Sequence, residues 1–263
     1  MKIVVLLKQT PDTETQIVLS ADSKNIDHSQ SKYIINPYDE FAIEEALRIQ
    51  EKRPGTEVVL LCFGPQSAKE RIIKGLAMGP DRAVLIDNAG WEHADALVTA
   101  KILSTAVKAE SCDLVLCGKQ SIDDDNMSVG VMLAEFLHWP HVNVVTKVVM
   151  NGDKVNIERE IEGGQTEVYE SRLPLVLGAH KSLNTPRYTS LPGIMKAKKK
   201  PLDVKTVKDY GLEVSTLQAL QQTKVSSYSY PPQKPKGKIF QGESVEVMVD
   251  KLVKSLREEA KVI

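Results

Sequence analysis

Short apolar runs without polar alternation recur along the first two thirds of the chain. They are rich in leucine and β-branched residues and occupy residues 3–7, 58–63, 83–86, 114–117 and 175–177. A short continuous apolar run is typical of a strand that is buried on both faces, as in a parallel sheet covered by helices. We therefore expect these runs to be strands of one such sheet.

Helical patterns lie between these runs. The segment 38–52 places Phe41 and Leu47 on an apolar side and its acidic residues on the other, and Asn36 and Pro37 suit an N-terminal cap and first turn. The alternation of strands and helices predicts an α/β fold, with an open, mostly parallel, Rossmann-like sheet and helices on both faces. Further helices are expected at residues 67–78, 94–109 and 126–137.

The pattern changes after Pro140. Strand-like segments at residues 142–150, 154–160 and 166–171 are separated by glycine-containing hairpin signals. We therefore expect an antiparallel extension of the sheet.

The last part of the chain is expected to be a long C-terminal arm with a terminal helix. Prolines, Pro235 among them, interrupt the arm at residues 221–238, and an amphipathic helix is expected at residues 244–261. Ordering such an arm costs chain entropy unless it lies on a surface, which could belong to the protein's own core or to a partner subunit. We divide the chain into an α/β domain, residues 1–220, and the arm and helix, residues 221–263.

The loops after the expected strands are the candidate ligand site, because ligands of open parallel sheets bind beyond the carboxyl ends of the strands. The most unusual loop starts at Gly118 and runs through residue 126 into a helix. Backbone N–H groups at the start of a helix bind phosphate readily. We therefore expect a phosphate on the amides of residues 127–130, with Ser128 as a side-chain donor, which would make residues 1–220 a nucleotide-binding domain.

Three aspartates, Asp123, Asp124 and Asp125, complicate this site. Since carboxylates repel phosphate, we expect them to cap the helix or to hold sugar hydroxyls and base nitrogens. The plain structural alternative is an acidic cap on a surface helix. A metal site is not favoured, because adjacent side chains point in different directions.

The sequence lacks the common catalytic and nucleotide-binding motifs. GxGxxG, GxxxxGK[ST], GxSxG, HExxH and CxxC do not occur, which excludes P-loop NTPases and the usual dinucleotide fingerprint. The histidines are scattered, and His138 and His141 flank a Trp-Pro pair as expected of a structural corner. We expect no catalytic residues and hence an accessory protein rather than an enzyme.

Charge and composition narrow the class further. Lys and Arg number 34 against 35 Asp and Glu, a formal charge of −1, which argues against binding to nucleic acid or anionic lipid. No apolar stretch approaches the roughly 18 residues of a membrane span, and the N-terminal run is too short for a signal peptide. We therefore expect a cytoplasmic protein that is not embedded in a membrane. Its three cysteines, expected to be reduced and buried, are Cys62, Cys112 and Cys117.

A second candidate site follows the last buried run. Residues 186–195 combine two prolines with an apolar group, and a lysine-rich run follows at residues 196–200. A stiff loop with an apolar tip and positive flanks suits transient docking, because charge raises the encounter rate and the tip fixes the pose. The plain alternative is an ordinary connection packed on the core.

Taken together, these segments resemble the beta subunits of electron transfer flavoproteins, nearly end to end. The shared motifs are Asn36-Pro37-Tyr38-Asp39-Glu40 and residues 118–125, 158–164 and, most distinctively, 183–200. The resemblance implies a heterodimer with an alpha subunit, an FAD bound mainly by alpha, and an adenine-nucleotide-binding beta subunit that holds AMP. Electrons would come from acyl-CoA and related dehydrogenases and pass to a quinone oxidoreductase.

The resemblance also implies which residues make contacts. The docking loop, residues 184–200, would present Leu191 at its tip. Glu160, with Arg159 beside it, would contact the flavin domain of alpha. Further docking residues would be Pro192, Ile194, Met195 and Lys196. The AMP contacts would be Leu6, Asn36, Pro37, Tyr38, Asp39, Phe63, Gly118, Gln120, Ser121, Asp123, Asp124, Asp125, Asn126, Met127, Ser128 and Val129.

Departures from the family pattern leave alternatives. Residues 126–130 read Asn-Met-Ser-Val-Gly where many relatives carry a Gln and a Thr, so the phosphate contacts would be rearranged. Electron-bifurcating relatives bind a second FAD in place of AMP and usually carry a Gly in the acidic loop, so the three intact aspartates favour AMP. A stand-alone ATP-binding module of the stress-protein kind would need neither the arm nor the basic loop. An adenylyl-transferring enzyme would need phosphate motifs that this chain lacks.

Overall fold

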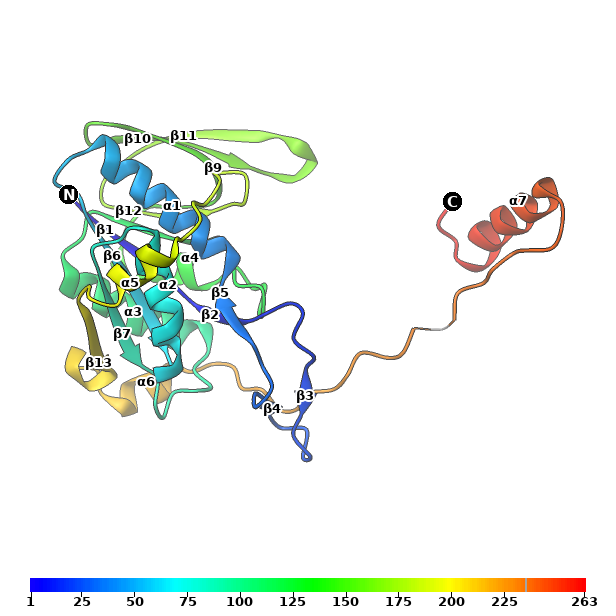
Figure 1. Ribbon diagram of the computed structural model, residues 1–263, viewed down its shortest axis with the longest axis horizontal. Coiled ribbons are helices and arrows are strands. Elements are labelled where there is room, and N and C mark those ends of the chain that lie inside the picture. The colour runs from blue at the N-terminus through cyan, green and yellow to red at the C-terminus, as the bar shows by residue number, and fades with distance from the viewer. Residues whose placement is uncertain (235) are drawn as a thin grey trace. The chain divides into compact units, whose positions relative to one another are not determined.

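The computed structural model describes residues 1–234 and 236–263. These residues form two compact units, Met1–Tyr228 and Ser229–Ile263. In the first unit, a central sheet lies between layers of helices (Figure 1). Pro235, which belongs to the expected arm, lies outside the described residues.

A nine-stranded sheet forms the centre of the described part of the first unit. In spatial order its strands are β11 (Thr166–Arg172), β10 (Lys154–Glu160), β9 (His141–Asn151), β12 (Leu175–Ala179), β8 (Leu114–Gly118), β1 (Lys2–Leu6), β6 (Glu57–Gly64), β7 (Arg82–Asp87) and β13 (Leu202–Thr206). From β9 through β12, β8, β1, β6 and β7 to β13, all neighbouring strands are parallel. The prediction of an open, mostly parallel sheet is confirmed.

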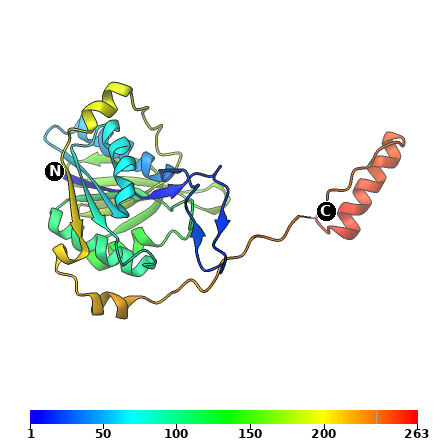
Figure 2. The same cartoon turned by 60° about the horizontal axis from the view of Figure 1, so that its bottom comes forward.

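Helices cover both faces of the sheet. On one face lie α1 (Pro37–Lys52), α2 (Lys69–Met78) and the short α5 (Leu191–Ala197), and on the other α3 (Ala96–Glu110), α4 (Val129–Leu137) and α6 (Val214–Leu220). Figure 2 shows α5, in yellow, above the sheet and α6, in gold, below it. Neighbouring residues of β1 enter opposite cores, Ile3 the first and Val4 the second, and both are fully buried. This two-sided burial explains why the strand shows no polar alternation.

The strand order reverses at β1. From β1 the chain moves outward through β6 to β7, and it then returns to the other side of β1 to form β8 and β12. In open α/β sheets, ligands bind beyond the carboxyl ends of the strands at such a reversal. The loops that follow β1 and β8 therefore define the part of the molecule in which to look for a site.

The antiparallel extension is also confirmed. β10 pairs antiparallel with both β9 and β11. The first turn contains Gly152 with φ +67°, and the second is a 3₁₀ turn at Glu162–Gly164.

The structure contains elements that the hydrophobic pattern did not predict. β13 extends the sheet beside β7 in a part of the chain for which no strand was predicted, and its residues are mostly exposed because an edge strand has one neighbour. α5 lies inside the expected docking loop, and α6 follows β13. Two small antiparallel pairs precede α1, formed by β2 (Gln9–Pro11) with β5 (Tyr33–Ile35) and by β3 (Val18–Leu19) with β4 (Ile26–Asp27).

Some helix boundaries differ from the prediction. The start of the fourth helix at residue 126 was wrong, because α4 begins at Val129. Asp125 and Met127 have φ values of +50° and +54°, and left-handed backbone cannot continue a right-handed helix. A 3₁₀ turn, Gln66–Ala68, precedes α2.

The second unit contains α7 (Val245–Lys254), which continues as a π-helical turn at Ser255–Glu259 instead of an α-helix to residue 261. Ser244 caps α7 by accepting from the backbone N–H of Val247 at 3.5 Å. Within the described residues, no helix combines the length and apolar character needed to cross a bilayer.

The three cysteines are buried and free, as predicted. Cys62 belongs to the core on the α1 and α2 side, while Cys112 and Cys117 belong to the core on the α3 and α4 side. Burial raises the pKa of each thiol to about 12.

Candidate functional site

Lys8 follows β1 and reaches the loop that follows β8. Its Nζ donates to Ser121 Oγ at 3.1 Å, to Asp123 Oδ1 at 2.8 Å and to Asp124 Oδ2 at 2.8 Å. Burial by itself would lower the pKa of Lys8, but the attraction of the two aspartates outweighs it and raises the pKa. The ammonium therefore remains charged at neutral pH and offsets the negative charge of the acidic loop.

The aspartates have partners other than the helix. Asp123 and Asp124 bind Lys8, and Asp125 Oδ1 accepts from Gln120 Nε2 at 2.5 Å. Of the two roles expected for these carboxylates, capping the helix was therefore wrong. Holding sugar hydroxyls or base nitrogens stays a prediction.

Asp39, in the first turn of α1, joins the ends of two strands. Its Oδ2 accepts from the backbone N–H of Lys8 at 2.7 Å, and its Oδ1 accepts from the backbone N–H of Gly118 at 3.0 Å and from Asn36 Nδ2 at 2.9 Å. Burial raises the pKa of Asp39 to about 7, against the lowering effect of these hydrogen bonds. One buried carboxyl group thus fixes the positions of the loops after β1 and β8.

Asn36 occupies the N-cap position of α1, as expected, but its side chain does not cap the helix. Its Nδ2 also donates to Gln120 O at 2.9 Å, and its Oδ1 accepts from the backbone N–H of Ile122 at 3.3 Å. The Asn-Pro motif therefore ties α1 to the acidic loop 84 to 86 residues away.

Gly118 lies where the end of β8 meets the first turn of α1. A Cβ atom there would lie 2.5 Å from Asp39 Oδ1 and 2.6 Å from Tyr38 Cβ. A side chain at this position would push α1 away from the end of β8, so the glycine permits the close approach.

The start of α4 offers backbone donors. Ser128 is its N-cap residue, and within the described chain its side chain makes no cap. Ser128 Oγ instead donates to Asn126 O at 2.9 Å, and Asn126 Oδ1 accepts from the backbone N–H of Ser128 at 3.1 Å. Ser128 therefore does not cap the N–H groups of residues 129–131, which lie at the positive end of the helix. This geometry suits an anion.

The remaining expected AMP residues lie at this same edge of the sheet. Leu6 ends β1, and Phe63 lies near the end of the neighbouring β6. Pro37 begins α1, and the Lys119 ammonium lies 5.3 Å from the centre of the Tyr38 ring. The structure therefore brings the residues of the expected nucleotide site together along the carboxyl ends of β1, β6 and β8.

The expected docking residues lie on α5 rather than in a loop. Ser190 caps this helix, its Oγ accepting from the backbone N–H of Gly193 at 3.1 Å. Leu191 is 79% exposed and Met195 is 71% exposed, while Ile194 is half-buried. Pro192 and Lys196 are exposed beside them.

Arg159 and Glu160 lie at the end of β10. Arg159 Nε is 3.8 Å from Glu167 Oε2, and Glu160 Oε2 is 3.8 Å from Nδ1 of the buried His180. Burial, together with the nearby Lys119, lowers the pKa of His180. Sequence reasoning did not single out His180, because Glu160 ends β10 whereas His180 follows β12, and β9 lies between these two strands in the sheet.

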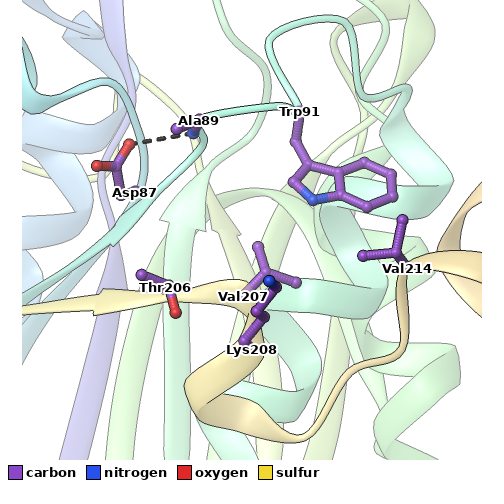
Figure 3. A pocket seen from close by; sticks show the side chains of 7 residues that line it. All are labelled: Asp87, Ala89, Trp91, Thr206, Val207, Lys208 and Val214. Carbon is purple, nitrogen blue, oxygen red and sulfur yellow. Dashed lines mark hydrogen bonds between the residues drawn. The ribbon is translucent and has the colours of Figure 1, made fainter.

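A cavity of about 240 Å³ lies away from this site, at the carboxyl ends of β7 and β13 (Figure 3). It is smaller than the roughly 300–1,000 Å³ of typical small-molecule sites. The strand β6 separates it from β1, so it is distinct from the polar network described above. Its lining residues are Asp87, Ala89, Trp91, Thr206, Val207, Lys208 and Val214.

The sequence matches a known family and named relatives. Residues 24–210 match the family model described as "Electron transfer flavoprotein domain". A protein named "Electron transfer flavoprotein subunit beta" from Bacillus subtilis is 40% identical over 264 residues, covering 100% of both chains. Proteins of the same name from Bradyrhizobium diazoefficiens (40% over 224 residues, 85% of this chain and 89% of the relative) and Homo sapiens (37% over 254 residues, 96% of each) are also similar.

The fold and the polar network at its strand reversal define an open α/β protein whose helices cover both faces of a parallel sheet. Within that class, the chain belongs to the electron transfer flavoprotein family and is similar along its whole length to the beta subunits. The resemblance inferred from the motifs is thereby confirmed, and the chain is assigned to electron transport by flavoproteins.

Proposed function

We propose that this chain is the beta subunit of a heterodimeric electron transfer flavoprotein. Paired with an alpha subunit in the cytoplasm, it accepts electrons from acyl-CoA and related dehydrogenases and passes them, through the FAD of the complex, to a quinone oxidoreductase. The alpha subunit binds most of the FAD, and beta binds a structural AMP and carries the docking segment. Beta is a carrier subunit and contributes no catalytic residue.

The observation that carries the nucleotide part of this proposal is the hydrogen-bonded network of Asp39, Lys8 and Gly118 at the strand reversal. It is built from loops and backbone amides, and it lies next to the uncapped start of α4. This is the place where open α/β sheets bind nucleotides.

The residues present fit an adenylate. The first-turn amides of α4 and Ser128 would hold the phosphate, and the charge of Lys8 reduces its repulsion by the acidic loop. Asp125 and its neighbours would accept hydrogen bonds from sugar hydroxyls, and Leu6 and Phe63 would pack against the base. Bound in this way, the nucleotide would join the ends of β1, β6 and β8 and rigidify the subunit.

The exposed apolar residues of α5 support the docking role. Leu191 and Met195 present apolar surface beside the exposed Lys196, Lys198 and Lys199. The lysines would attract acidic partners over a distance, and the apolar tip would then fix the complex.

Two other parts of the chain would contact the alpha subunit. Glu160 and Arg159 would hold its flavin domain, and FAD, when bound there, supplies the electron-exchanging chemistry. In the second unit, Val245, Val249 and Leu252 of α7 are 46–66% exposed, and this apolar surface would pack on alpha.

Identification of the bound nucleotides tests the proposal. Beta would be co-expressed with an alpha subunit, and the purified complex would be denatured and its released nucleotides separated by chromatography. We expect a yellow heterodimer that releases FAD and AMP in equal amounts. Two FAD per complex would contradict AMP binding and indicate the bifurcating type, and a colourless ATP-binding homodimer would contradict the carrier function.

A further inference from the structure

The docking segment, residues 184–200, is a long crossover between distant strands. The chain leaves β12 near the middle of the sheet and re-enters it at β13 on the far edge, and on the way it passes over α1 and α2. Figure 1 shows α5 lying beside α2. A crossover of this length adopts one conformation only if side chains fix it to the underlying helices.

Arg187 fixes the N-terminal end of the segment to α1. Its Nε and Nη2 donate to the two oxygens of Glu44 at 2.7 and 3.1 Å, and its backbone N–H donates to Glu44 Oε2 at 3.1 Å. Its Nη1 lies 2.9 Å from Glu51 Oε1, about two turns further along α1. A bidentate arginine–carboxylate pair fixes direction as well as distance.

Glu44 is unusual for a helix surface because it is only 4% exposed. Burial by itself would raise the pKa of this carboxyl group, but the hydrogen bonds from Arg187 and Arg48 outweigh it and lower the pKa. Glu44 is therefore ionised at neutral pH and depends on Arg187 as a partner. Asn184 adds a second attachment, donating to Phe41 O and to Glu45 Oε2, both at 3.0 Å.

Lys200 fixes the C-terminal end of the segment to the end of α2. Its Nζ donates to Leu76 O at 3.1 Å, Gly79 O at 2.7 Å and Pro80 O at 2.6 Å. The last carbonyl groups of a helix favour a cation. Lys200 therefore differs from the exposed Lys199 before it, although the two look alike in the sequence.

Between these two attachments the segment is exposed on one side only. Leu191 and Met195 face away from the protein, whereas Ala197 on the same helix is 1% exposed. The attachments thus fix the helix ends, and the helix fixes the direction of its apolar side chains.

We propose that Arg187, Glu44 and Lys200 are positioning residues that preorganise Leu191 and Met195 for docking. This inference rests on the docking role proposed above. A segment already held in its binding conformation loses little further conformational freedom when a partner binds, and that saving appears as affinity. The three residues act through α5 and do not themselves touch the partner.

The test measures electron transfer from an acyl-CoA dehydrogenase to the FAD-loaded heterodimer as the heterodimer concentration is varied. For Arg187→Gln and Lys200→Gln we expect the apparent KM for the heterodimer to rise about three- to tenfold, with kcat and FAD content unchanged. Arg48→Gln is the matched control, because Arg48 binds the same Glu44 carboxylate, with Nε to Oε1 at 3.1 Å, and has no bond to the docking segment. Assays at high salt remove the contribution of long-range charge.

A double variant separates positioning from general damage. Leu191→Ala should raise the KM, and adding Arg187→Gln to Leu191→Ala should raise it little further, because both changes remove the same docking interaction. If Leu191→Ala is impaired but Arg187→Gln behaves like Arg48→Gln, or if the two losses simply add, the positioning inference is overturned. If Leu191→Ala itself has no effect, the docking function fails instead. Should Arg187→Gln yield no heterodimer, Arg187→Lys, which keeps the charge but not the bidentate geometry, takes its place with the same expected rise in KM.

Discussion

The two ends of β1 each carry a lysine bound to carboxylates, but the arrangements differ. At the amino end, Lys2 Nζ lies 3.4 Å from carboxylate oxygens of both Glu57 and Glu110, and Arg82 binds the same two residues. Two cations therefore meet two anions, and all four residues lie on regular strands or at a helix end.

At the carboxyl end the charges do not balance. Lys8 meets Asp123 and Asp124, and the buried Asp39 lies behind them, hydrogen-bonded to backbone amides of two loops. In this cluster at the amino end, each of the four charged side chains has a counter-charge, so no ligand is needed to balance them. The carboxyl end has carboxylates in excess and backbone donors to spare, and a ligand with hydroxyl groups and a phosphate would satisfy both.

The largest expected effect comes from adding one carbon atom at the carboxyl end. Gly118→Ala forces a Cβ to within 2.5 Å of Asp39 Oδ1, so we expect the free energy of unfolding to fall by about 3 kcal/mol and AMP to be lost. Chemical denaturation and nucleotide analysis of the heterodimer measure both. Gly64→Ala at the end of β6 is the control, because its Cβ would make only ordinary contacts, at 3.6 and 3.7 Å. Equal behaviour of the two variants would contradict the tight packing at Gly118.

Removing the cation at the carboxyl end comes next. Lys8→Met leaves Asp123 and Asp124 without their counter-charge beside the proposed phosphate position, so we expect the Kd of AMP to rise about thirtyfold. AMP titration of nucleotide-depleted heterodimer gives this value. Lys147→Met breaks a similar pair, 2.7 Å from Glu158, elsewhere on the sheet and should leave the Kd unchanged. An unchanged Kd in Lys8→Met would mean that the phosphate does not lie near the acidic loop.

Removing one of the two cations at the amino end should affect stability alone. Arg82→Met leaves Glu57 and Glu110 with one partner fewer. Because these groups are partly buried, we expect the free energy of unfolding to fall by about 1–2 kcal/mol. The AMP content of the complex should not change. Loss of AMP in this variant would show that the two ends of β1 are coupled.

The last contrast concerns slope: the pH dependence of stability should have opposite signs at the two ends. The pKa of Asp39 rises from its ordinary value of 3.8 to about 7, so its contribution to stability falls as pH rises across that interval. At the amino end, burial by itself would raise the pKa of Glu57 and of Glu110, but the interactions with Arg82 outweigh it and lower both pKa values below the ordinary 4.5. The contribution of these two groups to stability is therefore lost as the pH falls below that value.

Unfolding measurements between about pH 3 and pH 8 on wild type, Asp39→Asn and Glu110→Gln separate these contributions. The wild-type advantage over Asp39→Asn should shrink with rising pH, by at most about 1.4 kcal/mol per pH unit. The advantage over Glu110→Gln should shrink with falling pH. Slopes of the same sign would contradict the contrast between the two ends.

The sequence predicted the sheet well because most of its strands are buried on both sides. β1 and β6 are recognisable in the sequence as continuous apolar runs. β13, with the sequence Leu-Asp-Val-Lys-Thr, has only one neighbouring strand and keeps polar side chains, so the hydrophobic pattern does not reveal it. α5 was taken for a loop because two prolines, Pro186 and Pro192, interrupt the segment. Ser190 followed by a proline in the first turn was nevertheless a usable helix-start signal.

The sequence predicted where the candidate site lies but not which of its residues bind one another. The rule that ligands bind at strand ends located the loops after β1 and β8. It did not show that Lys8 binds Asp123, because the two are 115 residues apart and meet only when the strands are side by side. The expected capping role of the aspartates was wrong for the same reason, since a local pattern cannot report a distant cation.

The buried thiols have a practical consequence for following how this subunit opens. Alkylating reagents react with the thiolate, and with pKa values of about 12 almost none is present at neutral pH. Each cysteine therefore becomes reactive only when its surroundings loosen. Cys62 monitors the layer beneath α1 and α2, whereas Cys112 and Cys117 monitor the layer beneath α3 and α4. Their alkylation rates, measured separately by mass spectrometry, would show which of these two layers opens first.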